Sequence, residues 1–226
     1  MLFHPRPRQC YVVAATPRSG SNYLCQLLAS TGMLGVPREY FNAPGRRAYD
    51  DPRYPEHLRG QVRQILTTGA TPNGICGVKI HAYQVRNHAG DPLGRLARRC
   101  PVIAVRLHRD DWLGQAISWT RAQQTQQFRA GDPEAAPPAY SRAAIDAART
   151  DLADQAAWWD LELARRGWPV IDVGYENLMS NAGAEVARIG ARLGVDAVTL
   201  RPEEVTVRVQ RDGVNAQWRA DYLDGT

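Results

Sequence analysis

Small polar residues and one arginine interrupt an apolar run near the start of the chain. The run Tyr11 to Ala15 is typical of a buried strand, and leucines at helical spacing begin at Leu24. The stretch between them, "TPRSGSN", occupies residues 16 to 22. At a strand-to-helix turn, backbone N–H groups converge and the helix dipole adds positive character. The turn therefore suits a phosphate or a sulfate; a plain helix capped by Ser19 or Ser21 is the alternative.

The turn differs from the loop of an ATP-hydrolysing P-loop enzyme. That loop reads G-x-x-x-x-G-K-[ST], whereas here Gly20 is followed by Ser21 and Asn22, with neither the lysine nor the first glycine. The chain also shows no convincing Walker B carboxylate, which is the second nucleotide-binding motif of such enzymes. These absences weigh against a nucleotide kinase or NTPase, which remains as an alternative.

Three further polar residues come at or near the ends of apolar runs or in a compact motif. Lys79 lies in "GVKIH", Arg109 follows the run ending at Leu107, and Glu39 lies in "PREYF". Open α/β sheets bind ligands at the carboxyl edge of their strands, so Lys79 and Arg109 are expected there. Glu39 is a candidate proton acceptor. His81 is expected to point to the same side as Lys79, but a lone histidine at a strand end is usually structural and is left out of the catalytic set.

Strands and helices must alternate to place these residues together. Four apolar segments predict strands, at 11–15, 74–80, 101–107 and 169–173. They are apolar at consecutive positions, which is typical of a parallel sheet covered on both faces. Helical patterns occupy 21–30, 92–99, 112–128, 141–166 and 182–193, with a short helix around Trp218. The order predicts an α/β fold with a parallel central sheet flanked by helices.

Two stretches lack a clear period. Residues 37–59 are rich in Pro, Arg and Tyr and predict a long functional loop, and residues 130–139 separate two helices. Tyr40, Tyr49 and Tyr54 suit a ring-shaped ligand or ordinary packing. The tryptophans are expected in the core or at a subunit interface; they are Trp112, Trp119, Trp158 and Trp159.

Composition narrows the class of protein. The net charge is +5, which favours an anionic ligand without separating nucleic acid, a membrane surface and a small polyphosphate. The 28 basic residues are mostly arginine. Either a need for bidentate contacts to anions or the base composition of the genome would explain this excess. The four cysteines form no CxxC pair, and no run is long enough to span a membrane. A cytoplasmic protein with reduced thiols, no membrane span and no metal site is expected.

Four motifs in order resemble one enzyme family. "TPRSGSNYL" resembles the 5′-phosphosulfate loop of sulfotransferases that use 3′-phosphoadenosine-5′-phosphosulfate (PAPS). Its continuation, "STGMLGVPREYFN", resembles the segment that follows this loop in the bacterial trehalose 2-sulfotransferase-like subgroup. "TPNGICGVKIH", "HRDDWLGQAISWTRAQQT" and "QRDGVNAQW" agree, so the resemblance runs from about Tyr11 to Tyr222. It implies one sulfotransferase domain over residues 1–226, with a P-loop-like three-layer α/β fold and PAP, the desulfated nucleotide, as product.

The resemblance also implies roles for residues. The loop would hold the 5′-phosphate and the sulfuryl group through Arg18, Ser19, Gly20, Ser21 and Asn22. The 3′-phosphate would be held by Arg109 and Ser118, with Gln115 as a competing donor one turn earlier. A solvent-facing helix hydroxyl is the alternative for Ser118.

The C-terminal loop would close over the 3′-phosphate. Gln210 and Arg211 are the candidates, with Arg208 as the alternate, although the arginine-lysine-glycine signature of eukaryotic enzymes is absent and a solvated basic loop is nearly as good an explanation.

The implied chemistry is in-line sulfuryl transfer to a hydroxyl of a carbohydrate, glycolipid or other small molecule. Glu39 would take the proton, and burial beside Tyr40 and Phe41 is expected to raise its pKa. Arg18 would stabilise the leaving phosphate and Lys79 the sulfuryl or bridging oxygen, with no metal. Members of this subgroup can be dimeric, so a homodimer is an expectation. A non-catalytic module for anionic polymers is the second alternative.

Overall fold

A four-stranded parallel sheet forms the centre of the molecule. The computed structural model describes residues 7–43, 54–128, 133–207 and 213–225. The strands are β1 (Gln9–Ala15), β2 (Ile75–His81), β3 (Val102–His108) and β4 (Val170–Gly174), and their order in the sheet is β2-β1-β3-β4. All neighbouring strands pair in parallel. The four predicted strands and the α/β class are confirmed, with bounds that differ by one or two residues.

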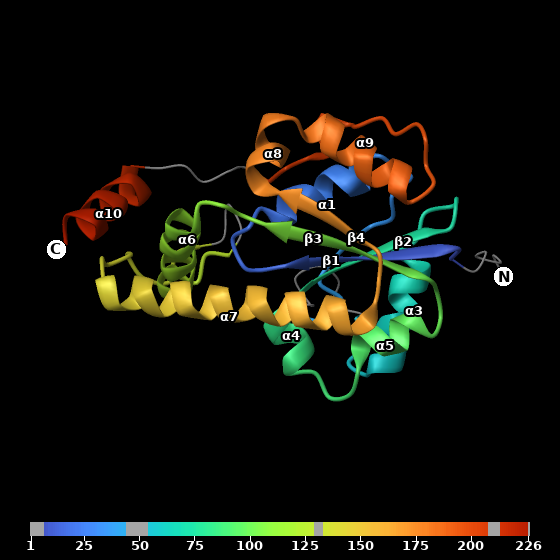
Figure 1. Ribbon diagram of the computed structural model, residues 1–226, viewed down its shortest axis with the longest axis horizontal. Coiled ribbons are helices and arrows are strands. Elements are labelled where there is room, and N and C mark those ends of the chain that lie inside the picture. The colour runs from blue at the N-terminus through green and yellow to red at the C-terminus, as the bar shows by residue number, and fades with distance from the viewer. Residues whose placement is uncertain (1–6, 44–53, 129–132, 208–212, 226) are drawn as a thin grey trace.

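Helices cover both faces of this sheet (Figure 1). On one face lie α1 (Ser21–Ser30), α8 (Tyr175–Ser180) and α9 (Ala182–Arg192). On the other lie α3 (Leu58–Thr67), α4 (Ala82–Arg86), α5 (Pro92–Ala97) and α7 (Arg142–Arg166). The layers have the arrangement of a P-loop-like fold.

Alternate residues of β1 divide the core between the two faces. Val12 and Ala14 pack with the layer of α3 and α7, while Val13 and Ala15 pack with the layer of α1 and α9. The four cysteines are free and buried. Among the tryptophans, Trp159 is buried in the first of these clusters.

A third cluster lies at the end of the molecule where β1 and β3 finish. There α6 (Trp112–Thr125) packs between α7 and α10 (Gly213–Asp224). The single turn η1 (Pro202–Glu204) lies against the opposite end of α1, where Arg201 donates to the Ser30 carbonyl. Ile117, Leu152 and Trp218 form the buried centre of the third cluster, with Trp119 packed against them. Trp112, at the start of α6, is 41% exposed. The end of β3 and the start of α6 thus stand beside the β1-to-α1 turn.

Three helices depart from the sequence expectation. Residues 58 and 59 were assigned to the irregular loop, but they begin α3, whose buried face includes Val62 and Ile65. The helices α4 and α8 have five and six residues and follow directly on β2 and β4, so their apolar residues show too few turns to reveal a period.

Candidate functional site

The β1-to-α1 turn is held from beneath by buried hydrogen bonds. Ser19 is fully buried, and its hydroxyl donates to the Thr16 carbonyl at 2.8 Å. Gln115 of α6 donates to Thr16 Oγ1 at 2.8 Å and to the Pro17 carbonyl at 2.6 Å. Gln115 therefore braces the backbone of the turn. Arg18 has a positive φ of 60°, which directs its side chain away from the start of α1.

Gly20 ends the turn in a conformation that only glycine adopts easily. Its φ is +83°, and it caps α1, which has no acidic residue in its first turn. A Cβ at this position would lie 2.6 Å from the ring of Tyr175. The start of α1 is therefore shaped by close backbone packing, and it presents its N–H groups without a competing carboxylate.

Substitution Gly20→Ala is expected to destabilise the protein by about 2 kcal/mol or more, because left-handed strain adds to the clash with Tyr175. Gly167→Ala is the matched control. Gly167 also has positive φ, +61°, but a Cβ there meets nothing within 4 Å, so a loss of only about 1 kcal/mol is expected. Urea unfolding of both variants measures the difference, and equal losses would show that the Tyr175 contact is unimportant.

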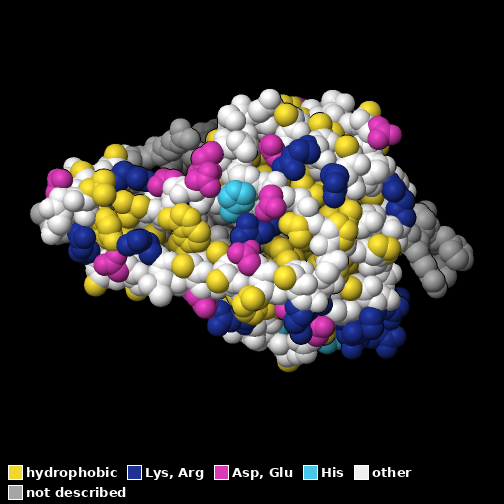
Figure 2. Space-filling model, in the orientation of Figure 1, with side chains coloured by type: hydrophobic (Ala, Val, Ile, Leu, Met, Phe, Trp, Pro, Cys, Tyr) yellow, Lys and Arg dark blue, Asp and Glu magenta, His cyan; other side chains and the backbone are white. Residues whose placement is uncertain are grey.

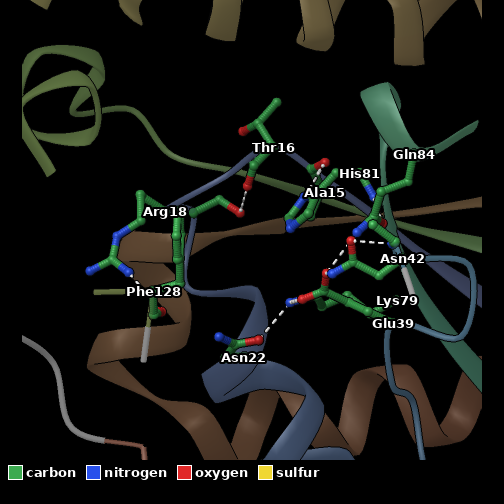
Figure 3. Close-up of polar contacts among 12 residues, drawn as sticks. Ala15, Thr16, Arg18, Asn22, Glu39, Asn42, Lys79, His81, Gln84 and Phe128 are labelled. Carbon is green, nitrogen blue, oxygen red and sulfur yellow. Dashed lines mark hydrogen bonds and ion pairs between the residues drawn. The ribbon is translucent and has the colours of Figure 1, made fainter. Parts of the chain in front are cut away.

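The side chain of Arg18 points toward α6, away from Asn22 and Lys79 (Figure 3). Its Nε donates to Ser118 Oγ at 2.8 Å and its Nη1 to the Phe128 carbonyl at 3.2 Å. The structure thus brings Arg18 and Ser118 together, although the family resemblance places them at opposite ends of the nucleotide. Ser118 is half-buried, so its hydroxyl faces the protein and not open solvent.

Arg18 shares its surroundings with two other arginines. Burial lowers its pKa, and the nearby charges of Arg109 and Arg121 lower it further. A pocket opens beside it, lined by Arg18, Ser118, Arg121, Ala122, Thr125, Gln127 and Asn215. Arg121 donates to Asn215 Oδ1 of α10 at 2.7 Å. Like charges gathered around a pocket favour an anion within it.

Arg121 and Asn215 are two residues of this pocket that were not predicted from the sequence. Both lie inside motifs of the family resemblance, "SWTRAQQT" and "VNAQW", and the spacing of Arg121 three residues after Ser118 places these two on one face of α6. That spacing is the signal that would have found Arg121. Asn215 could not be predicted to line the pocket, because no local pattern in the sequence gives the position of α10 against α6.

Arg109 stands just after β3 and reaches toward the same turn. Its Nη2 pairs with Asp111 Oδ2 at 3.0 Å, and its guanidinium lies 4.8 Å from the ring centre of Tyr175. Its Nη1 is 3.5 Å from the Arg18 carbonyl. Its Nε is buried and has no hydrogen-bond partner among the described residues. A buried N–H donor left in this way fits an anion that would accept from it.

A second polar group lies on the other side of the turn, at the edge of β2. The Nζ of Lys79, a residue only 3% exposed, lies 2.5 Å from Glu39 Oε1 and donates to Asn22 Oδ1 at 2.5 Å (Figure 3). Glu39 Oε2 accepts from Asn42 and from Gln84, each at 2.6 Å. Three of the predicted residues, Glu39, Lys79 and Asn22, therefore meet at one point.

Backbone pairing explains how a loop residue reaches the sheet. Arg38 forms an isolated parallel bridge with Val78, and the N–H of Lys79 donates to the Arg38 carbonyl at 3.0 Å. This pairing adds one residue to the edge of β2. Glu39, the next residue, is thereby fixed beside Lys79.

The expectation of a raised pKa for Glu39 is wrong. Burial does act to raise it, but the charge of Lys79 and the hydrogen bonds from Lys79 and Gln84 outweigh burial and lower the pKa to about 2. Burial and Lys79 together lower the pKa of His81 to about 4. At neutral pH the site therefore holds an ionised carboxylate, an ammonium group and a neutral imidazole, whose Nδ1 lies 3.0 Å from the Ala15 carbonyl.

The remaining candidates fall into two groups. Tyr40 and Tyr54 are buried in the core, with ring centres 5.6 Å apart, which supports the packing interpretation. The other predicted residues lie outside the described residues: Tyr49, Arg208, Gln210 and Arg211. In the described part of the chain, no three His, Cys, Asp or Glu side chains group as a metal site. No helix in that part is long and apolar enough to cross a membrane.

Comparisons with known proteins agree over nearly the whole chain. The family model described as Stf0 sulphotransferase matches residues 10–224. A trehalose 2-sulfotransferase of Mycobacterium tuberculosis (strain Erdman) is 33% identical, over 82% of this chain and 84% of that protein. One of Mycolicibacterium smegmatis is 29% identical, over 98% and 96%. The solved sulfotransferase domain from the curacin biosynthetic pathway has a similar fold, with a TM-score of 0.52 and 14% identity over 95% of this chain and 83% of that one.

Proposed function

Because the chain belongs to the Stf0 sulphotransferase family, and is thus a sulfotransferase, we propose that it transfers a sulfuryl group from PAPS to a hydroxyl of a carbohydrate, with Glu39 as proton acceptor. The observation that carries the proposal is the Glu39–Lys79 pair beside the β1-to-α1 turn. In this pair, the Glu39 carboxylate can accept a proton and the Lys79 ammonium group can bind the transferred group. Both lie next to a helix N-terminus that suits a phosphate.

Two places in the site support the choice of a donor that carries phosphates at both ends. The start of α1, with Asn22 and Lys79 beside it, suits the 5′-phosphosulfate. The side chains of Arg18, Ser118 and Arg121 offer positive charge and hydrogen-bond donors to the 3′-phosphate, together with Arg109 and its buried, unsatisfied Nε. We propose this division, in which Arg18 serves the 3′ end or bridges both ends. Gln210 and Arg211 remain candidates to cover the 3′-phosphate.

When bound, PAPS would supply the sulfuryl group, and PAP would leave through an oxygen of its 5′-phosphate as the bond from that oxygen to sulfur breaks. Lys79 and the N–H groups of the turn stabilise the negative charge that gathers there. Glu39 takes the proton of the hydroxyl as its oxygen bonds to sulfur. Any anion that draws Lys79 Nζ away from Glu39 also weakens the contact that lowers the carboxyl pKa, so donor binding strengthens the base.

The acceptor class follows from the relatives. Both are named trehalose 2-sulfotransferase, which supports a sugar hydroxyl as acceptor, free or in a glycolipid. We also propose that residues 1–226 form one domain, act in the cytoplasm on such acceptors and not on nucleic acid, assemble as a homodimer, and need no metal for transfer.

A transfer assay tests this function. Purified protein is incubated with ³⁵S-labelled PAPS and, separately, with trehalose, a trehalose glycolipid, or a simple alcohol that is not a sugar, and products are separated by chromatography. Label is expected on a carbohydrate. No labelled product with any hydroxyl acceptor, or phosphate transfer from γ-labelled ATP in its place, would overturn the proposal.

A further inference from the structure

Gln84 is a buried residue that no motif singled out. It lies in α4, three residues after the end of β2, and is 5% exposed. Its Oε1 accepts from the backbone N–H of His81 at 2.9 Å, and its Nε2 donates to Glu39 Oε2 at 2.6 Å. A backbone N–H can only donate and a carboxylate can only accept, so the two neighbours fix which end of the amide faces Glu39.

The carboxylate of Glu39 divides its contacts between two oxygens. Oε1 faces Lys79, while Oε2 accepts from Gln84 and Asn42. Asn42 belongs to the same turn as Glu39, since its backbone N–H donates to the Glu39 carbonyl at 3.0 Å, and it would move with that turn. Among the described residues, Gln84 supplies the contact to Oε2 that comes from another element, α4. It ties the carboxylate to the end of the strand that carries Lys79.

We propose that Gln84 is a positioning residue, which holds Oε2 of Glu39 so that Oε1 stays aimed at the reacting centre when Lys79 turns to the donor. This role rests on the proposed function of Glu39. Glu39 is also faced by Lys79 and His81 of β2 and by Cys25 of α1. Of these groups, Lys79 is the one charged at neutral pH that contacts the carboxylate, so loss of Gln84 leaves Lys79 and Asn42 to orient it.

Two variants separate positioning from packing. Gln84→Met keeps the size of the side chain but removes its hydrogen bonds to Glu39 and His81, and is expected to lower kcat about 10-fold with an unchanged KM for PAPS. Gln84→Glu retains an acceptor for the His81 N–H but places a second carboxyl against Glu39. One proton is then shared by the pair, so an apparent carboxyl pKa is expected to rise well above that of Glu39 in the wild type.

Carbon-13 NMR of protein labelled at glutamate carboxyls measures this titration, with Glu39→Gln to assign the signal. The wild-type Glu39 carboxyl is expected to stay ionised from pH 8 to 4, so that its signal does not shift. In Gln84→Glu, a carboxyl signal is expected to titrate in that range. Gln217→Glu is the matched control: exposed Gln217 donates to Asp221 Oδ1 at 2.7 Å on α10, so the same change should leave both kcat and the Glu39 signal unaltered.

Unaltered titration in Gln84→Glu, or kcat in Gln84→Met within about twofold of wild type, would overturn the role of Gln84. If the wild type transfers no sulfate to any hydroxyl, the proposed function fails. The NMR titration would still decide whether Gln84 contacts and controls the Glu39 carboxyl, so the two failures are distinct.

Discussion

Protein carrying Glu39→Gln is expected to transfer sulfate about 10²- to 10⁴-fold more slowly than wild type, with the Kd for PAP changed by less than about threefold. Glutamine has the size of glutamate but does not take up a proton near neutral pH. Lys79 keeps its contact with Asn22, so the donor side of the site retains its residues. Single-turnover transfer and calorimetry with PAP measure the two quantities.

A control is needed because Glu39→Gln breaks a buried ion pair, which costs about 3–5 kcal/mol of stability when a charge is left alone. Assays therefore run well below the melting temperature of the variant. Glu204→Gln breaks a surface pair with Arg201, 2.9 Å apart and 46% exposed on each side, and should leave transfer unchanged. An equal loss of transfer rate and PAP affinity in Glu39→Gln would remove Glu39 from its role as base.

Arg109→Ala is expected to raise the Kd for PAP about 10- to 100-fold, because hydrogen bonds to a charged group contribute about 1.5–3 kcal/mol. The reason is the buried Nε without a partner, in a guanidinium held by Asp111 and stacked on Tyr175. The Kd of this variant for adenosine 5′-phosphate, which has no 3′-phosphate, should rise less than about threefold. Calorimetry with both nucleotides gives the comparison.

Arg106→Ala is the matched control for Arg109→Ala. Arg106 lies on β3, the strand that Arg109 follows, and is held by Asp160 at 2.5 Å and Asp172 at 3.4 Å. Its removal therefore changes the net charge equally without touching the turn. Its Kd for PAP should match wild type. If Arg109→Ala weakened both nucleotides equally, Arg109 would be a support for the turn and not a contact to the 3′-phosphate.

Local sequence patterns were sufficient for most of the fold. The helix predicted at 21–30 has those bounds in α1, because a glycine in the left-handed region precedes it and leucines mark its buried face. The parallel sheet followed from strands whose apolar residues stand at consecutive positions and not at alternate ones. The helix α4 escaped prediction because five residues show no period, and Gln84, which it carries, was missed with it.

The electrostatics of the site were beyond such patterns. Glu39 and Lys79 are 40 positions apart, and only the bridge of Arg38 to β2 makes them neighbours. From the sequence, burial alone predicts a raised pKa for Glu39. The charge of Lys79, whose position the sequence does not reveal, lowers it instead. The direction of Arg18 depends likewise on its positive φ and on Ser118, a hundred residues further along the chain.

Titration of PAP into the wild-type protein by calorimetry, with a chelator present, measures whether the site binds a nucleotide with phosphates at both ends. The site described here predicts heat with one PAP per chain and a Kd on the order of 1–100 µM, with adenosine 5′-phosphate binding at least about 10-fold more weakly for want of the 3′-phosphate. No heat with PAP, or equal affinity for the two nucleotides, would contradict a site built for a nucleotide phosphorylated at both ends.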